Sequence, residues 1–368
     1  MIPFKKIFHS SLFAVNIVAS ILLLMSAFSD IVSPERMVAF SFLGMGFPFI
    51  LIINIIFVVW WLMFAQWKKC LVCLACIVLC GSAIKAYFPI HLKTESIPED
   101  CIKVLTYNVM SFHHCKPHSK KSPNPVLQYI IDSEADIVCI QEHRTYQDNY
   151  HLSANDLKSA LKMYPYSHIH RVERAENHGV YGLSIYSKFP ITSTEKIKFN
   201  SVYNGAFKSE LNINGKQVTL INCHLETNSL SDEERKQYDD MIKSPDSKKL
   251  DAVAGQAVKK LKPAFKAREM QANQIAEVLK NDSNLYQIVC GDFNDTPISY
   301  ARRTIKGNMK DAFAETGCGF GITYNQNSFY FRIDYILHSQ NIESYNCSVG
   351  DLKDSDHYPV YTWLRLKD

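Results

Sequence analysis

The segment that decides the fold is YQIVCGDFNDTP, residues 286–297. Its first half, from Tyr286 to Cys290, is a short and nearly continuous apolar run, which is typical of a strand covered on both faces. Its second half places Asp292 and Asn294 directly after that run. The segment therefore predicts a buried strand that carries acidic and amide side chains at its end.

Comparable strand ends recur in the part of the chain after about residue 100. They are Asn108 in LTYNV, Glu142 in IVCIQE, His224 in INCHLE, Asp334 in RIDYIL, and Asp356 with His357 in SDHYPV. Each position taken alone has an ordinary structural explanation, such as a strand end or a core histidine. Six such places, counting the one at Asp292, suggest that the strand ends converge on one site. The residue types suit hydrolysis at phosphorus, because carboxylate and amide oxygens bind Mg²⁺ or Mn²⁺ and Asp or His can move protons.

Strand-like runs dominate the chain from Ile102 onward, and helical segments interrupt them. The expected strands are residues 102–109, 137–141, 183–187, 206–213, 218–225, 286–290, 332–337 and 358–366. The expected helices are residues 125–133, 156–163 and 264–279, and Thr296 is expected to cap a further helix beginning at Pro297. This order predicts an α/β sandwich of mixed sheets covered by helices.

The motifs GDFND, DYIL and SDH, in this order, resemble those of the endonuclease/exonuclease/phosphatase superfamily, also called DNase I-like. The resemblance runs from about Ile102 to the C-terminus. It implies a four-layer α/β sandwich of two mixed sheets. It also implies metal-dependent hydrolysis of phosphoester bonds, in which a water activated by an Asp attacks in line.

The resemblance implies a divalent-metal cofactor, Mg²⁺ with Mn²⁺ as the alternative ion. Glu142 would be the central metal ligand, and Asn108 and Asp356 would lie close to the metal.

Five further residues would carry the catalytic step according to the same resemblance. Asp292 would activate the water, and Asn294 would hold the phosphate or orient that water. His357 would contact the scissile phosphate with its ring oriented by Asp334. His224 would lie on the other side of the phosphate, whereas members specialised for abasic DNA tend to have Tyr there.

The N-terminal part of the chain is strongly apolar, with three stretches at about residues 7–28, 38–64 and 71–88. Each approaches or exceeds the ~20 residues that cross a bilayer core. We therefore expect a membrane region with three transmembrane helices at residues 1–93 and a catalytic domain at residues 94–368.

The basic residues predict how this region is oriented. Lys5 with Lys6, and Lys68 with Lys69, mark the N-terminus and the second connection as cytoplasmic. Three crossings would then place the catalytic domain on the outer (periplasmic or extracellular) side of the cytoplasmic membrane. Seven of the eleven cysteines lie after the apolar stretches, and the absence of a disulfide pattern among them is unusual for a domain on that side.

Charge limits the substrate classes. Seven basic and two acidic residues lie before Thr94, and removing them from the totals of 40 and 36 leaves the remainder nearly neutral. A domain that grips a duplex usually has a basic excess. A lipid-like or small phosphoester is therefore favoured, and nucleic acid remains the alternative substrate. A catalytically silent, membrane-anchored binding module is the rival from another class, and the oligomeric state stays open.

Three other features have two interpretations each. Cys70, Cys73, Cys76 and Cys80 have the spacing of an iron–sulfur motif, but their apolar neighbours favour a membrane helix. His113, His114, Cys115 and His118 could bind zinc, but their surroundings favour a solvated loop near the mouth of the site. Arg268 could hold a phosphate, with Glu226 as a supporting residue, but its charged helix favours a solvated position.

Overall fold

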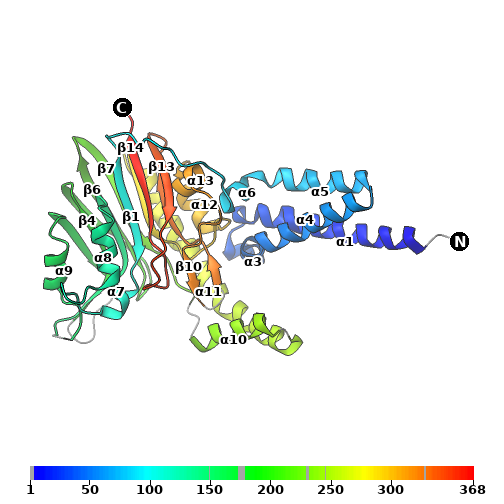
Figure 1. The fold of residues 1–368 in the computed structure, drawn as a ribbon, viewed down its shortest axis with the longest axis horizontal. Helices are drawn as coiled ribbons and strands as arrows, with labels where there is room; N and C mark the ends of the chain where they lie inside the picture. The colour runs from blue at the N-terminus through cyan, green and yellow to red at the C-terminus, as the bar shows by residue number, and fades with distance from the viewer. Residues whose placement is uncertain (1–3, 149, 173–178, 229–231, 245, 327–328) are drawn as a thin grey trace.

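The computed structural model describes residues 4–148, 150–172, 179–228, 232–244, 246–326 and 329–368. Two six-stranded sheets pack face to face, and a group of N-terminal helices extends from one side of them (Figure 1). The strands expected from the sequence are present, with bounds that differ by a few residues. The predicted sandwich of two mixed sheets is confirmed.

The first sheet has the strand order β13-β14-β1-β2-β4-β3. Its strands are β1 (Ile102–Asn108), β2 (Ile137–Thr145), β3 (Tyr166–Arg171), β4 (Val180–Ser187), β13 (Ile342–Val349) and β14 (Val360–Leu366). Only the β1–β2 pair is parallel, and the other pairs are antiparallel.

The second sheet has the order β5-β6-β7-β8-β12-β9. Its strands are β5 (Ile191–Ile197), β6 (Gly205–Ile213), β7 (Lys216–His224), β8 (Tyr286–Asp292), β9 (Lys310–Asp311) and β12 (Asp334–His338). Here β7 and β8 form the parallel pair. A separate small ribbon joins β10 (Tyr324–Gln326) and β11 (Phe329–Phe331).

Three apolar clusters hold these layers together. One lies between the sheets and includes Val104, Ile185, Phe207, Leu220 and Ile288. The outer face of the first sheet packs on α7 (Met110–Cys115), α8 (Pro125–Asp132) and α9 (Ala154–Ala160). The outer face of the second packs on α11 (Ser247–Asn281) and α12 (Tyr300–Lys306). Helix, sheet, sheet and helix therefore form the four layers; α10 (Asp232–Lys243) and α13 (Ala312–Thr316) complete the fold.

The helix predicted to start at Pro297 begins later. The Asp295 side chain accepts the backbone N–H of Thr296. Thr296 does not cap α12. Ser299 is the cap instead, because its hydroxyl accepts the N–H of Arg302 at 3.2 Å. The predicted position of the cap was therefore wrong by three residues.

The N-terminal apolar stretches form several helices rather than three continuous ones. These are α1 (Phe4–Ala27), a short 3₁₀ turn at Ser29–Ile31, α2 (Pro34–Met37), α3 (Ala39–Met45), α4 (Phe47–Met63), α5 (Trp67–Leu79) and α6 (Gly81–Tyr87). In the described chain one helix, Ile7–Ala27, is long and apolar enough to cross a membrane, and the number rises to three if α3–α4 and α5–α6 each count as one span. Both pairs are bent by 61°. Gly46 and Gly81 lie at the two breaks, where glycine weakens a helix.

The cysteine-rich stretch is part of these helices. Cys73 is buried and its thiol donates to Asn16 Oδ1 at 2.9 Å, and Cys70 and Cys80 are also buried. The thiols at residues 70–80 are free, and the described side chains form no cysteine cluster that could hold a metal. This agrees with the interpretation of a packed apolar helix.

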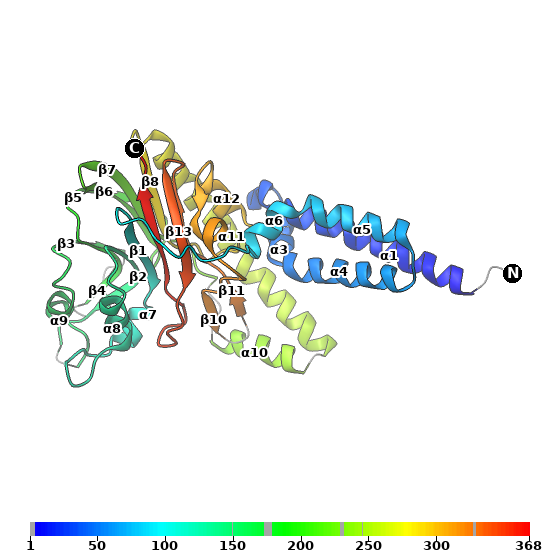
Figure 2. The same ribbon diagram turned by 45° about the horizontal axis from the view of Figure 1, so that its top comes forward.

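The N-terminal helices pack directly on the sandwich (Figures 1 and 2). Glu269 of α11 accepts the Ser33 hydroxyl at 2.5 Å and the N–H of Glu35 at 2.8 Å, at the start of α2. Ile298 joins an apolar cluster with Leu23 and Phe47. The two parts therefore share an interface.

A buried charge network closes this interface. Asp311 accepts from Arg302 at 2.6 Å and from Arg332 at 3.0 Å, and Arg332 also donates to the carbonyl oxygen of Ala86 in α6. Burial opposes ionisation of Asp311, but the two guanidinium charges outweigh it and hold the pKa of this carboxyl well below its usual range.

Asp311→Asn should lower the free energy of unfolding at neutral pH by about 3–5 kcal/mol, because two buried guanidinium groups lose their counter-charge. A depressed carboxyl pKa stabilises the fold above the unfolded-state pKa, and this contribution is lost as pH falls through the folded-state pKa. The difference between wild type and variant should therefore be full at pH 7 and shrink in acid. Thermal and denaturant unfolding of the full chain in detergent measures it.

Asp100→Asn is the matched control, because Asp100 pairs with Arg365 at 2.8 Å on the surface. Exposed pairs contribute little to stability, so this variant should unfold like the wild type. Equal unfolding curves for the Asp311 and Asp100 variants would contradict the role given to the network.

Candidate active site

The second sheet brings three of the predicted residues into one row. His224 at the end of β7 pairs in register with Asp292 at the end of β8, and Asp292 pairs with Asp334 at the start of β12. All three side chains are at most 2% exposed. Gly291 precedes Asp292 because a Cβ there would lie 1.9 Å from the carbonyl oxygen of Cys223. The close approach of β7 and β8 therefore depends on this glycine.

The first sheet adds two more residues through a local irregularity. The register of β2 shifts between Ile140 and His143, and Glu142 within that shift has a φ of 54°. Such a bulge redirects one side chain out of the regular alternation. The amide nitrogen of Asn108, at the end of β1, donates to Glu142 Oε1 at 3.2 Å and to Asp292 Oδ2 at 3.1 Å. Asn108 thereby joins carboxylates from both sheets.

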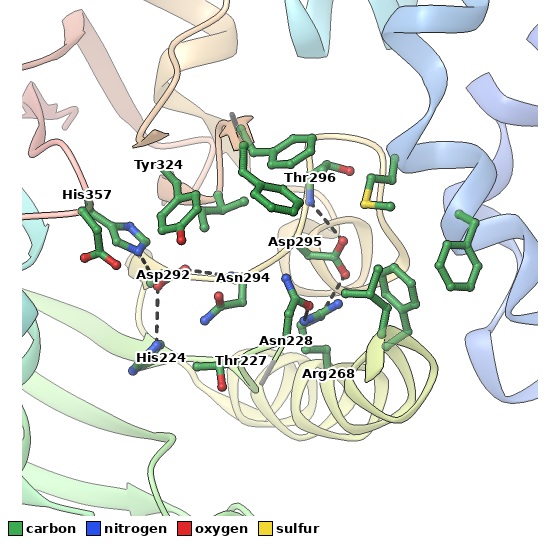
Figure 3. Close-up of a pocket in the computed structure, with 18 of the residues that line it drawn as sticks. His224, Thr227, Asn228, Arg268, Asp292, Asn294, Asp295, Thr296, Tyr324 and His357 are labelled. Atoms are coloured by element: carbon green, nitrogen blue, oxygen red, sulfur yellow. Dashed lines mark hydrogen bonds and ion pairs between the residues drawn. The ribbon is translucent and has the colours of Figure 1, made fainter. Parts of the chain in front are cut away.

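Two imidazole rings lie on either side of Asp292 (Figure 3). His224 Nε2 and His357 Nε2 are each 3.5 Å from Asp292 Oδ2. His357 Nδ1 lies 2.8 Å from Asp334 Oδ2, the contact that the family resemblance implied. Asn294 has a φ of 51°, and its N–H donates to Asp292 Oδ1 at 2.8 Å.

The three buried titratable groups are held in different protonation states. Burial, and then the charge of His357, lower the pKa of His224 to about 3, so this ring is neutral. Burial also opposes the charge of His357, but Asp334 and Asp292 outweigh it and raise its pKa well above the ordinary value. Burial is the main reason that the pKa of Asp292 rises to about 7. The site thus pairs one charged ring with one neutral ring around a carboxyl that titrates near neutrality.

The donor set fits a divalent cation. Glu142, Asp292, Asp334 and Asp356 supply four carboxyl groups, and Asp334 Oδ1 and Asp356 Oδ1 are buried without a hydrogen-bond donor among the described residues. Asp292, Asp334 and His357 can place one ligand atom each within 4.8 Å of the others. Because Asp334 and His357 already bind each other, Glu142 and Asp356 are the better candidates for metal ligands. Hard oxygen ligands of this kind suit Mg²⁺ or Mn²⁺.

Asn108 presents its amide nitrogen to the carboxylates, and its Oδ1 accepts the N–H of Met110 at 3.2 Å. In this arrangement Asn108 positions the carboxylates. Its role beside a metal stays a prediction.

The expectation for Arg268 was wrong, because this side chain is buried rather than solvated. It is 1% exposed, its Nε donates to Asp295 at 3.2 Å, and its Nη1 donates to Asn228 Oδ1 at 2.8 Å. Arg268 follows Leu261 and Phe265 at helical spacing, so it lies on the apolar face of α11. That periodicity was the signal in the sequence that could have placed it.

The histidine-rich segment is in part the solvated loop that was expected, because Lys116, Pro117 and residues 119–123 are exposed and lie outside helices and strands. It begins with α7, where Phe112 and Cys115 are buried, and His113 Nδ1 lies 2.8 Å from the carbonyl oxygen of Asp354. His118 accepts the N–H of Asn124 at 3.2 Å. The start of the segment therefore packs beside the loop that carries Asp356, and the rest is solvated.

A cavity of about 290 Å³ contains the site and extends beyond the residues that the sequence predicted. Besides the catalytic candidates, residues lining it include Thr227, Asn228, Arg268, Tyr324, Phe329 and Phe331, and Phe42, Met45, Gly46 and Phe49 from the N-terminal helices. The N-terminal residues could not be found from strand-end motifs, because they come from another part of the chain.

Comparisons with known proteins agree with this geometry. Residues 105–357 match the Endonuclease/Exonuclease/phosphatase family, and residues 5–87 match a domain of unknown function. An endonuclease/exonuclease/phosphatase from Beutenbergia cavernae is 16% identical, with 73% of this chain and 72% of that chain covered and a TM-score of 0.51. The human Nocturnin catalytic domain with bound sulfate anion is 16% identical, with 76% and 96% covered and a TM-score of 0.51. These two likenesses establish the fold. No curated protein matched the chain.

Mg²⁺ should stabilise the fold, because it would relieve the crowding of carboxylates at the site. A ligand at 100 times its Kd stabilises by about 2.7 kcal/mol. The unfolding temperature of chelator-treated protein should therefore rise on addition of Mg²⁺ or Mn²⁺. Glu142→Gln should need at least tenfold more metal for the same rise, whereas Glu343→Gln, in the distant strand β13, should behave like the wild type. Identical titrations for all three proteins would contradict the assignment.

Proposed function

Because the chain belongs to the endonuclease/exonuclease/phosphatase family, we propose that it is a divalent-metal-dependent hydrolase of phosphoester bonds. The observation that carries this proposal is the position of Asp292, buried between two imidazole rings and bonded to the amide that also holds Glu142. A general base works best when its pKa lies near the working pH. Burial raises the pKa of Asp292 above its ordinary value, which makes its carboxylate a better proton acceptor.

The proposed division of labour follows from the charges and contacts of each residue. Asp292 takes the proton of the attacking water, and the backbone N–H of Asn294 fixes the orientation of its carboxylate. His357, positively charged and held by Asp334, donates to a phosphoryl oxygen. His224 lies on the other side of Asp292 from His357. Its ring is neutral, and its Nε2 has no hydrogen bond among the described residues.

The metal would be held by Glu142 and Asp356, and when bound it would neutralise phosphate charge and stabilise the transition state. Asn108 keeps the two sheets in register at this point by bonding to Glu142 and Asp292. A catalytically silent binding module is disfavoured, because the groups needed for hydrolysis are all present and converge. A phosphodiesterase or phosphatase activity is proposed ahead of a nuclease activity, since the catalytic region has no net basic excess.

We also propose that the N-terminal helices cross the membrane three times and leave the catalytic domain on the outer side. The basic pairs at Lys5–Lys6 and Lys68–Lys69 support this orientation. A reporter that is active only outside the cytoplasm should work when fused after Asp368. Activity of a cytoplasm-only reporter at the same position would refute the three-crossing arrangement.

A hydrolysis screen of the purified full chain tests the function. It compares bis-p-nitrophenyl phosphate, phospholipids, inositol phosphates and plasmid DNA, with Mg²⁺ and with chelator. At least one phosphoester should be cleaved only with metal. If His224 assists the departing oxygen, His224→Ala should slow substrates with poor leaving groups far more than nitrophenyl esters. No metal-dependent cleavage of any substrate would overturn the proposal.

A further inference from the structure

One wall of the catalytic cavity is built from the N-terminal helices. Phe42 and Met45 of α3, Gly46 at the break, and Phe49 of α4 line the same cavity as Asp292 and His357. Leu261 and Phe265 of α11, and Phe329 and Phe331 of the β10–β11 ribbon, also line it. The cavity therefore has a charged end at the strand edges and an apolar end at the bend between α3 and α4.

The position of this apolar wall is fixed by packing. A Cβ at Gly44 would lie 2.4 Å from the carbonyl oxygen of Ile298, so α3 rests on the backbone of the sandwich domain. The rings of Phe42 and Phe265 meet edge to face, with centroids 5.3 Å apart. Helices α3 and α4 are bent by 61° relative to each other, and Phe49, near the start of α4, lines the cavity. These contacts hold the apolar wall against the sandwich, where it forms one side of the catalytic cavity.

Between the two ends lies a small polar group formed by Arg268, Asn228 and Asp295 (Figure 3). Figure 3 shows these residues on the side of the cavity toward the N-terminal helices, with Asp292, His224 and His357 on the other side. The charge of Arg268 is balanced by Asp295 at 3.2 Å, and its guanidinium lies 4.8 Å from the centroid of the Phe265 ring. A ligand that extends from Asp292 toward the N-terminal helices would contact these polar groups first and the aromatic rings beyond them.

The apolar end opens onto the exposed surface of α4. Phe49 lines the cavity and is 65% exposed, and Ile52, Ile53 and Ile56 continue an exposed apolar surface along the same helix. This surface belongs to one of the bent pairs long and apolar enough to cross a bilayer. The cavity is therefore continuous with a surface that lipid chains would contact.

We propose that the substrate is a lipid phosphoester, whose phosphate lies at Asp292 and whose apolar chain lies against Phe42, Phe49 and Phe265. This inference rests on the proposed phosphoester hydrolysis and names its substrate class. An inositol phosphate would place hydroxyl groups against these rings and lose their hydration. An apolar chain gains about fourfold in affinity for each methylene buried there.

The test compares methyl and octyl p-nitrophenyl phosphodiesters, which share a leaving group and differ only in the apolar chain. With the full chain in a maltoside detergent and Mg²⁺, the octyl ester should have a kcat/KM at least tenfold above that of the methyl ester. Phe49→Ala should reduce this ratio at least threefold. Ile53→Ala is the matched control, because Ile53 is exposed on the same helix outside the lining of the cavity. Ile53→Ala should keep the wild-type ratio. Because all three proteins are assayed in the same detergent, comparing their ratios also corrects for partition of the octyl ester into micelles.

A second readout does not depend on turnover. Octylphosphonate should raise the unfolding temperature of the Mg²⁺-loaded protein more than methylphosphonate, and this difference should shrink in Phe49→Ala but not in Ile53→Ala. Equal ratios and equal shifts in all three proteins would overturn the lipid assignment while leaving hydrolysis intact. Selective stabilisation by octylphosphonate without cleavage of either ester would support the lipid site and refute the hydrolase function.

Discussion

The crowding of carboxylates at the strand ends of the two sheets is the constraint that organises this protein. Glu142 and Asp292 come from different sheets, yet both accept from the single amide nitrogen of Asn108. Asp334 and Asp356 add two further carboxyl groups with buried oxygens that lack a donor among the described residues. Like charges brought this close repel one another, and a counter-charge relieves that repulsion. The charged ring of His357 supplies part of it, and a divalent cation would supply the rest.

Several local features exist because of this constraint. The bulge in β2 brings Glu142 out of the regular alternation, and Gly291 lets β8 approach β7 closely enough for Asp292 to sit beside His224. The Asp334 contact keeps His357 in one orientation. On the far side of the cavity the N-terminal helices are held by the buried network around Asp311 and by the contact of Gly44 with Ile298. The catalytic centre and the apolar wall are thus placed by separate sets of contacts.

The sequence predicted the parts of this arrangement that depend on local pattern. Apolar runs ending in Asp, Asn or His identified β1, β7 and β8, because a strand covered on both faces leaves a clear signal. Asp292 and His224 were expected at one site, since both end apolar strand-like runs; that their strands are neighbours is a finding of the structure. The protonation states of Asp292 and His224 could not be predicted, because their pKa values depend on burial and on His357, which lies far along the chain.

Features that depend on tertiary contact were missed. Arg268 looked solvated among charged neighbours, although its spacing from Leu261 and Phe265 places it on the apolar face of α11. Its contacts with Asp295 and Asn228 satisfy its charge in that buried position. The breaks at Gly46 and Gly81 could be suspected from propensity, but hydropathy alone suggested continuous spans. The cavity wall at Phe42 and Phe49 could not be predicted from motifs, because it requires the packing of α3 on α11.

The central claim is that Asp292 acts on the water while Glu142 acts through the metal. The most direct measurement is the metal dependence of kcat for Asp292→Asn and Glu142→Gln, with the substrate that the wild type cleaves best. Asp292→Asn should lose about 10²–10⁴-fold in kcat at unchanged KM and gain little from excess metal, because it lacks the base. Glu142→Gln should recover much of its rate as Mg²⁺ or Mn²⁺ is raised. Near wild-type turnover by Asp292→Asn, or equal rescue of both variants by metal, would contradict this account.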